Sequence, residues 1–456
     1  MTRILLVSSN ITTDPFPVYP LGLAVIASAL AGCGHTVDQF DFLVSGESEE
    51  ALRERIRSFG PKYVCVSMRN LDDCDSLTAA TYPVIAKRLV EVIRETCSAK
   101  VIIGGSAFSI LPEEILAFTG ADHGVVGEGE RVIGDLIRDL DAGGCPPRVL
   151  RSEALIPGQE LISPLYDSEL VEYYLQHSGM VNLQSKRGCA HGCIYCSYPS
   201  LEGKAYRFRD PRAVVDDMEK AIADHQIGNF FFTDSVFNDS EGRYLEIAEE
   251  MLRRKQSLRW CCYIRPEGIG RQEIALLKRA GLYAAELGTD AACDTTLRNL
   301  GKGFTFADVL GVNRAFVAER VPCAHFVMFG GPGETRETVL EGLANLEQLE
   351  HTVVFAFTGI RILPGTPLRH LAIREGFLEE GTLLQDPIFY QSPLIEGTVM
   401  NELITAAFWG HRDRIFPPEV SKKMLAVMHR FGHHGLLWDT LIQYPKEPVG
   451  TETIRG

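Results

Sequence analysis

Short apolar strands and amphipathic helices alternate twice along this 456-residue chain, and their order is what most constrains its fold. In the first run, residues 3–9 (RILLVSS) and 100–105 (KVIIGG) are typical of buried strands. The stretches between such strands have the apolar spacing of amphipathic helices. A β-α-β-α order of this kind builds a doubly wound, largely parallel sheet. We expect its ligand-binding loops to leave the carboxyl ends of the strands.

The second run follows residues 146–175, which show little regular periodicity and are interpreted as a linker. Residues 176–390 contain about six strands, among them NFFFTDS at 229–235 and AAELGTD at 284–290. This is too few for a closed eight-stranded barrel but enough for a partial (β/α)6 barrel. The sequence therefore predicts an α/β chain with a Rossmann-like domain at 1–145, the linker, a partial barrel, and a helical region at 391–456.

The charge balance and the chain's start limit its partners. Forty-five basic against sixty acidic residues give a net charge of −15, which argues against nucleic-acid binding and anionic membrane surfaces. The start, MTRILLVSSN, is typical of a first strand, and no apolar run reaches the roughly 20 residues of a membrane span. We expect a cytoplasmic protein. Its twelve cysteines would stay reduced there, so clustered cysteines indicate a metal site.

Cys189, Cys193 and Cys196 form such a cluster, with C-x3-C-x2-C spacing on one short loop. Three thiolates can each bind one iron of a cubane cluster, whereas iron–sulfur clusters usually have four cysteine ligands. The missing ligand would leave one iron open, as catalytic zinc sites keep an open position. Zinc with His191 as a fourth ligand, and cysteines that only pack, are the alternatives.

This motif, with the aromatic Tyr195 before its last cysteine, resembles the hallmark of the radical S-adenosylmethionine (radical SAM) superfamily. The resemblance implies a [4Fe–4S] cluster whose open iron binds S-adenosylmethionine, and reductive cleavage to a 5′-deoxyadenosyl radical. It also implies an electron donor such as flavodoxin or ferredoxin. The cofactor carries this chemistry, and the protein orients the reactants and excludes water.

Further stretches resemble the strand ends that bind S-adenosylmethionine in this family. The alternative for Asp234 is that it caps the next helix, and the alternative for Arg265 and Glu286 is that they form a structural ion pair. The residues that the resemblance assigns to S-adenosylmethionine are Thr233, Asp234, Ser235, Arg265, Glu286, Gly288, Asp290, Gly330, Gly331 and Arg361.

The first domain resembles the cobalamin-binding domain of the cobalamin-dependent branch, on the motifs GGSAFSILPEE at 104–114 and GEGE at 127–130. One departure is the loop SSNITTDPFPVYP at 8–20, which has no histidine to bind cobalt. A scaffold without cobalamin is the alternative. The expected cobalamin contacts are Ser9, Thr12, Ser67, Met68, Arg69, Gly104, Gly105, Ser106, Gly127 and Glu128.

Together these resemblances imply a methyltransferase. The expected reaction is cobalamin-dependent methyl transfer to an unactivated carbon, or a phosphinate phosphorus, of a small-molecule or lipid intermediate. The alternatives are radical cyclisation, rearrangement, oxidation or transfer of another group from S-adenosylmethionine, with or without cobalamin. A third is a non-enzymatic cobalamin- or metal-binding sensor.

Overall fold

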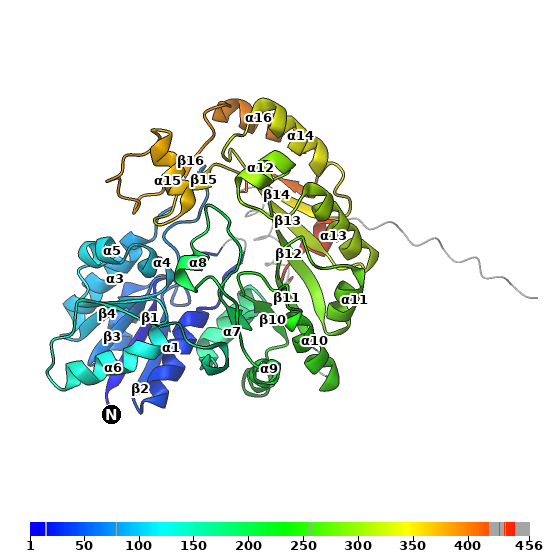
Figure 1. The fold of residues 1–456 in the computed structure, drawn as a ribbon. Coiled ribbons are helices and arrows are strands. Elements are labelled where there is room, and N and C mark those ends of the chain that lie inside the picture. The colour runs from blue at the N-terminus through cyan, green and yellow to red at the C-terminus, as the bar shows by residue number, and fades with distance from the viewer. Residues whose placement is uncertain are drawn as a thin grey trace, which may run out of the picture.

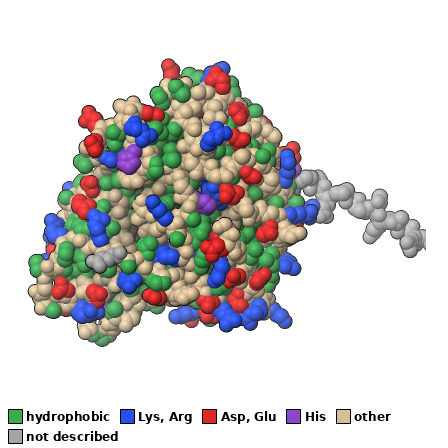
Figure 2. Space-filling model, viewed as in Figure 1, with side chains coloured by type: hydrophobic (Ala, Val, Ile, Leu, Met, Phe, Trp, Pro, Cys, Tyr) green, Lys and Arg blue, Asp and Glu red, His purple; other side chains and the backbone are tan. Residues whose placement is uncertain are grey.

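The computed structural model describes residues 1–13, 16–78, 80–152, 154–255, 258–418, 428, 433 and 435–442. Two parallel sheets dominate it, one in each of two domains that lie side by side (Figure 1). No helix in these ranges is long and apolar enough to cross a membrane. Acidic and basic side chains are interspersed over the face in Figure 2, so the net negative charge is not gathered in one area there.

The first domain is a parallel sheet of order β2-β1-β3-β4-β5-β6 with helices on both faces, as predicted. Its elements are β1 (Arg3–Ser8), α1 (Leu21–Gly32), β2 (Thr36–Asp41), α2 (Glu49–Phe59), β3 (Tyr63–Ser67), α3 (Pro83–Thr96), β4 (Lys100–Gly104), α4 (Ser106–Ile110), α5 (Pro112–Thr119), β5 (His123–Val126), α6 (Gly129–Asp141) and β6 (Val149–Arg151). The order reverses between β1 and β3, and such a switch point is where open α/β sheets bind ligands.

The two sides of each strand explain the layers of this domain. Leu5 and Val7 of β1 pack under α2, α3 and α5, whereas Ile4 and Leu6 pack under α1 and α6. Because side chains alternate across a strand, a run that is apolar at every position must be covered on both faces. Helix α2 also has local signals, since the Ser48 side chain caps its first turn and Gly60 ends it in the left-handed conformation.

The segment expected to be a linker, 146–175, is more ordered than its periodicity indicated. It contains β6, which pairs with β5, the 3₁₀ turn Gly158–Glu160, and the start of α7 (Ser168–His177). Asp167 caps α7 by accepting from the Leu170 N–H (3.1 Å). Strand β6 is too short for its alternation to be visible in the sequence.

The second domain is an open barrel sheet of order β17-β14-β13-β12-β11-β10-β7. The six predicted strands are present, and β17, in the expected helical region, adds a seventh beside β14. The elements are β7 (Val181–Leu183), β8 (Lys186–Arg187), α8 (Tyr198–Leu201), β9 (Arg207–Phe208), α9 (Pro211–His225), β10 (Asn229–Phe232), α10 (Arg243–Arg253), β11 (Arg259–Ile264), α11 (Arg271–Arg279), β12 (Leu282–Asp290), α12 (Asp294–Asn299), α13 (Phe306–Ala318), β13 (Cys323–Phe329), α14 (Arg336–Leu346), β14 (Val353–Thr358), β15 (Ile360–Arg361), α15 (Pro367–Arg374), β16 (Phe389–Tyr390), α16 (Gly397–Phe408), β17 (Arg414–Ile415) and α18 (Trp438–Leu441).

An apolar cluster fills the barrel towards the amino ends of its strands. Phe231, Cys261 and Ala284 contribute to it from β10, β11 and β12. Trp438 of α18 enters the same cluster and packs on Phe355 with ring centroids 5.2 Å apart. The expected C-terminal helical region is thus present as α16 and α18, and its remaining residues, 419–427, 429–432, 434 and 443–456, lie outside the described ranges.

Candidate functional site

The three cysteines lie on a loop between β8 and α8 that the fold holds at several points. The Cys189 N–H donates to Gly203 O (3.1 Å), and the Ile194 N–H donates to Leu300 O (3.0 Å). Gly188 N–H donates to the Glu202 carboxylate (3.1 Å). Cys189 is buried and the other two cysteines are half-buried. The loop is therefore positioned before any cluster binds.

The environment of Cys196 suits a ligand that needs metal to ionise. Burial raises the pKa of Cys196 to about 12, and Cys193 and Cys189 lie near enough to add to that rise. The free thiolate is thus disfavoured, and bound iron would stabilise it. Within the described ranges, no three His, Cys, Asp or Glu groups converge on one ion position. A cubane does not require such convergence, because each thiolate binds a different iron.

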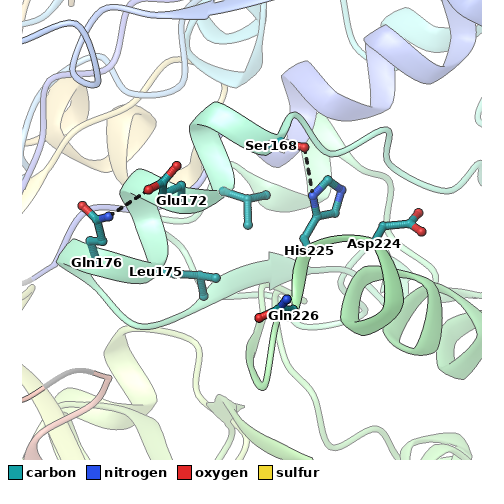
Figure 3. A pocket seen from close by; sticks show the side chains of 8 residues that line it. Ser168, Glu172, Leu175, Gln176, Asp224, His225 and Gln226 are labelled. Atoms are coloured by element: carbon teal, nitrogen blue, oxygen red, sulfur yellow. Dashed lines mark hydrogen bonds between the residues drawn. The ribbon is translucent and has the colours of Figure 1, made fainter.

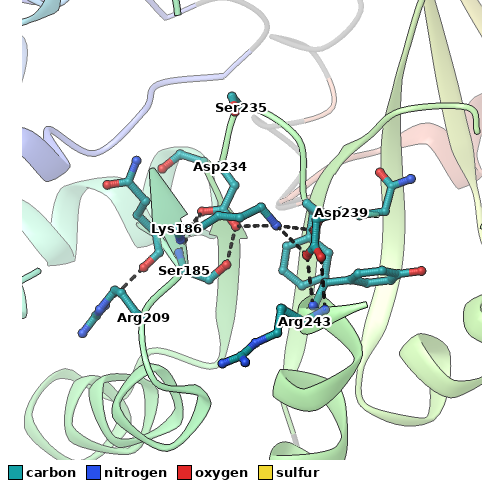
Figure 4. Close-up of polar contacts among 12 residues, drawn as sticks. Ser185, Lys186, Arg209, Asp234, Ser235, Asp239 and Arg243 are labelled. Carbon is teal, nitrogen blue, oxygen red and sulfur yellow. Dashed lines mark hydrogen bonds and ion pairs between the residues drawn. The ribbon is translucent and has the colours of Figure 1, made fainter. Parts of the chain in front are cut away.

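Asp234 anchors this loop from below and is completely buried (Figure 4). It accepts the backbone N–H of Ser185 (2.7 Å), the N–H of Lys186 (3.2 Å) and the Ser185 hydroxyl. The helix-capping alternative is wrong, because Asp239 caps α10 by accepting from Arg243 N–H (3.1 Å). Its predicted role toward S-adenosylmethionine stays a prediction, and the contacts of Asp234 are those of a structural anchor.

The neighbours of Asp234 tie the same strand end to the cysteine loop. Ser235 donates its hydroxyl to Gly188 O (2.9 Å), and Thr233 donates to Leu183 O (3.2 Å). Lys186 lies 3.3 Å from the Asp239 carboxylate, with its ammonium also bonded to Phe237 O (2.5 Å). The end of β10 is therefore a support for the loop that carries the cysteines.

Lys302 was not anticipated from the sequence, although it lies against the cysteine loop. Its ammonium pairs with Asp290, contacts the Cys193 thiol and lies 5.5 Å from the ring centroid of Tyr195. Asp290 has a positive φ of 62° at the end of β12. Asp290, which was predicted to bind S-adenosylmethionine, thus has a cationic partner that its strand-end position in the sequence could not identify.

The glycine loop after β13 is held open by Glu334, another residue that the sequence analysis missed. Its carboxylate accepts the N–H of Gly330 (2.5 Å) and that of Gly331 (3.1 Å). Burial raises the pKa of Glu334 to about 7, although these two bonds oppose the rise. Gly330 has a φ of 90°, which a residue with a side chain rarely adopts. The sequence signal that could have identified Glu334 is its position three residues after Gly331.

Arg265 and Glu286 do not form the ion pair that was one expectation for them. Arg265 instead pairs with Glu267 (3.0 Å) and lies over the Phe304 ring, 4.7 Å from its centroid. Glu286 is 4% exposed, and its Oε1 has no hydrogen-bond partner among the described residues. In the same strand, a Cβ at Gly288 would lie in van der Waals contact with Asp290 Oδ2, at 3.8 Å.

Arg361, predicted to bind S-adenosylmethionine, is bonded at all three of its nitrogens. Nε lies 2.7 Å from Asp72 of the first domain, and the other two donate to Ile362 O and Leu384 O, each at 2.7 Å. Ser76 of the same first-domain segment donates to Thr358 O. These contacts favour an interdomain role for Arg361 and engage three of its five N–H donors, and its assignment to S-adenosylmethionine stays a prediction.

The loops of the first domain meet at the carboxyl ends of β1, β3 and β4. Ser9 donates both its N–H and its hydroxyl to Ser67 O (3.1 and 3.0 Å), so it joins two of these loops. Thr12 Oγ1 and Asn10 Nδ2 are buried atoms with no partner in the part of the chain that the structure describes. Such orphaned groups are costly unless a ligand satisfies them.

Gly105 brings the loop after β4 against the loop after β3. A Cβ at Gly105, whose φ is 101°, would lie 2.4 Å from Met68 O. Ser106 then donates its hydroxyl to Arg69 O (2.6 Å), and Arg69 itself is half-buried. The remaining predicted contacts, Gly104 and Gly127, follow β4 and β5 at the same edge. The close backbone approach of these neighbouring loops suits the binding of a flat ligand.

Glu128, a predicted cobalamin contact, is instead engaged with basic side chains of the second domain. It pairs with Arg207 (2.6 Å) and Arg187 (3.1 Å) and accepts the Ile156 N–H (2.5 Å). Although burial opposes it, Arg207 and Arg187 lower the pKa of Glu128. Arg187 directly precedes the cysteine loop, so this network fixes the first domain relative to that loop.

A shallow surface pocket between α7 and α9 offers a Ser–His pair away from the cysteines (Figure 3). Ser168 Oγ and His225 Nδ1 are 3.3 Å apart. The Asp224 carboxylate extends away from the imidazole in Figure 3. Nucleophilic catalysis needs the base to be oriented by a third group, so this pair does not have the geometry of a catalytic triad.

Comparisons with known proteins cover both domains. The profile of the radical SAM superfamily matches residues 183–344, and that of the B12 binding domain matches residues 8–137. Tryptophan 2-C-methyltransferase of Streptomyces laurentii is 25% identical over 76% of this chain and 71% of that protein. Anaerobic magnesium-protoporphyrin IX monomethyl ester cyclase of Rubrivivax gelatinosus is 28% identical over 71% of this chain, which spans 60% of that relative's length.

Solved structures show the same two-domain arrangement. Radical S-adenosylmethionine methyltransferase TsrM from Kitasatospora setae, with cobalamin and a [4Fe–4S] cluster bound, has a TM-score of 0.84 and 23% identity over 96% of this chain and 97% of that one. The cobalamin-dependent S-adenosylmethionine radical enzyme OxsB has a TM-score of 0.71 and 16% identity over 95% and 71%. At these identities the likeness establishes the fold.

Proposed function

Because this chain belongs to the radical SAM superfamily and carries a B12 binding domain, we propose that it transfers a methyl group from S-adenosylmethionine to an unactivated carbon of a small molecule. The bound cofactors supply the reductive cleavage of the sulfonium and a transferable methyl group. The chain's own residues bind them, hold the loops in place and exclude water. Curated relatives named methyltransferases or methylases, with several different substrates, support this reaction.

One observation carries the proposal. Helix α8, which begins two residues after Cys196, contacts α4, which begins at the carboxyl end of β4. The loop for the cluster and the loops for cobalamin therefore face each other across the domain boundary. Methyl transfer between two cofactors requires this proximity, whereas a scaffold domain does not.

The residues present fit the three cofactors. Cys189, Cys193 and Cys196 would hold the cluster, since their loop is fixed by backbone bonds independently of the thiols. The Gly330–Gly331 loop after β13, whose N–H groups bind Glu334, would lie beside S-adenosylmethionine. Thr12, Asn10 and the Gly105 contact would border the corrin, and residues 8–20 contain no histidine that could bind its cobalt.

The electron donor and the compartment are further parts of the proposal. A cluster of this type needs one electron for each cleavage, and we infer flavodoxin or ferredoxin as the source. All twelve cysteines are free thiols, which supports a cytoplasmic location where the cluster ligands stay reduced. Activity with a chemical reductant but with neither protein donor would contradict the choice of donor.

The test is anaerobic incubation of reconstituted enzyme with S-adenosylmethionine labelled in its methyl group, a reductant and a panel of small apolar substrates. We expect labelled product together with S-adenosylhomocysteine and 5′-deoxyadenosine. Cys196→Ala should abolish all three, whereas the matched control Cys262→Ala, a buried cysteine that packs under the barrel helices, should retain them. Equal activity in the two variants would contradict the proposal.

Radical cyclisation without methyl transfer is a second candidate, favoured by the relatives named cyclases. The same incubation separates the two reactions. A product that forms with 5′-deoxyadenosine but carries no label would identify the second candidate and overturn the first.

A further inference from the structure

The barrel interior contains an unpaired carboxyl just above its apolar floor. Glu286 is in β12, where Ala284 faces the interior cluster while Ala285 and Leu287 pack beneath the outer helices. By strand alternation Glu286 faces inward with Ala284. Its neighbours across the sheet are Tyr263 in β11 and Ala324 in β13.

No group among the described residues satisfies this carboxyl. Its Oε1 is buried without a partner, and Arg265 is engaged with Glu267. Burial alone raises the pKa of Glu286 to about 8. Burial likewise raises the pKa of the facing thiol Cys261, so this group supplies no charge near neutral pH. An unpaired buried carboxyl destabilises a protein, which indicates that something other than stability accounts for its presence.

Partly exposed aromatic side chains lie on the inward face of the strands near Glu286. Tyr263 is 39% exposed although it lies inside the barrel, and it packs edge-on against Phe231 with centroids 4.9 Å apart. Phe326 and Phe357, on the inward positions of β13 and β14, are half-buried and stacked at 6.4 Å. Aromatic faces favour apolar bodies and cations.

We propose that Glu286 binds a positively charged nitrogen of the substrate, whose apolar body lies against Tyr263 and Phe357. The substrate class is therefore an amine-bearing, largely apolar small molecule. This inference rests on the proposed function in one respect, namely that the substrate enters the barrel from the carboxyl ends of the strands.

The position along the strand separates this role from that of S-adenosylmethionine. Glu286 precedes Asp290 by four residues, which is roughly 13 Å along a strand at about 3.3 Å per residue. Asp290 is next to Lys302 and the cysteine loop, whereas Glu286 is next to the apolar floor. A ligand that reaches Glu286 lies deeper in the barrel than the cluster does.

The experiment measures binding and proton release, not turnover. Anaerobically reconstituted holoenzyme is titrated calorimetrically at pH 7 with tryptamine and with tryptophol. Tryptamine carries an ammonium group where tryptophol carries a hydroxyl. Each titration is run in phosphate and in Tris, whose ionisation enthalpies differ. The variants are Glu286→Gln and, as matched control, Glu319→Gln, which removes a carboxylate paired with Arg271 outside the barrel.

We expect wild type and Glu319→Gln to bind tryptamine at least tenfold more tightly than tryptophol, with release of close to one proton per amine. Glu286→Gln should lose both the preference and the proton release while melting at or above the wild-type temperature. An amine that binds no better than the alcohol, including the case in which neither binds, overturns the inference. So does a variant that keeps the preference or melts lower, since the latter would show a structural partner. Amine selectivity without methyl transfer would instead count against the proposed function alone.

Discussion

Breaking the buried ion pair between Asp72 and Arg361 is expected to loosen the contact between the domains without weakening the binding of S-adenosylmethionine. The two side chains are 1% and 4% exposed, and their atoms lie 2.7 Å apart. Arg361 also donates to two backbone carbonyls, and Asp72 accepts the Cys74 N–H (3.0 Å). Removal of either charge would leave the other buried without its counter-ion.

The magnitude follows from that burial. Loss of one partner of a buried pair costs about 3–5 kcal/mol, whereas apolar replacement of both is often close to neutral. Asp72→Asn and Arg361→Met should each lower stability by about this amount, and the double variant by about 1–3 kcal/mol less than the sum. For domains of 150–250 residues, a loss of about 3–5 kcal/mol corresponds to roughly 6–20 °C in melting temperature.

The assay is thermal melting of the reconstituted enzyme, with S-adenosylmethionine affinity measured by calorimetry well below the melting temperature. Glu113→Gln, which breaks the exposed pair with Arg151, is the matched control and should leave both readouts unchanged. If Arg361→Met melted like wild type but bound S-adenosylmethionine tenfold more weakly, Arg361 would be a ligand and the structural reasoning would be refuted.

Three further predictions concern single side chains. Gly105→Ala should retain at least fivefold less cobalamin than wild type after desalting, because its Cβ would meet Met68 O. The control Gly143→Ala, with a similar positive φ and open space, should retain as much cobalamin as wild type, and equal corrin absorption in the two variants would contradict the prediction. Asp234→Asn should bind at least twofold less iron than wild type, because an amide cannot accept all three hydrogen bonds from Ser185 and Lys186, which precede the cysteine loop. Full iron content at unchanged stability would show that the Asp234 carboxylate is not needed to position the loop. Burial raises the pKa of Glu286 from 4.5 to about 8, so its contribution to stability is fully present below pH 4.5 and is lost as pH rises towards 8, by about 1.4 kcal/mol per pH unit. The melting temperature of Glu286→Gln relative to wild type should therefore increase from pH 5 to pH 8. Parallel pH profiles of the two proteins would show that the Glu286 carboxyl is not unpaired.

The fold was predictable because its signals are local and repeated. Continuous apolar runs at β1 and β4 indicated strands covered on both faces, and the glycine- and cysteine-rich motifs fell at strand ends, where parallel sheets place their ligand loops. Strands β6 and β17 were missed because two or three residues cannot show a period. The pairing of Arg361 with Asp72, 289 positions away, has no local signal at all.

The site residues divide by whether their polar atoms are already satisfied, and that division is invisible in the sequence. Asp234, Glu128 and Arg361 have the residue types that bind cofactors, yet each is bonded to this chain's own backbone or to opposite charges. Removing them should affect stability and the position of loops. Thr12 Oγ1 at the carboxyl-end loops and Glu286 Oε1 in the barrel are buried atoms that nothing described satisfies. Because an orphaned buried group costs free energy that only a bound partner recovers, these residues are better candidates for direct ligand contact than the charged residues that share their strand ends.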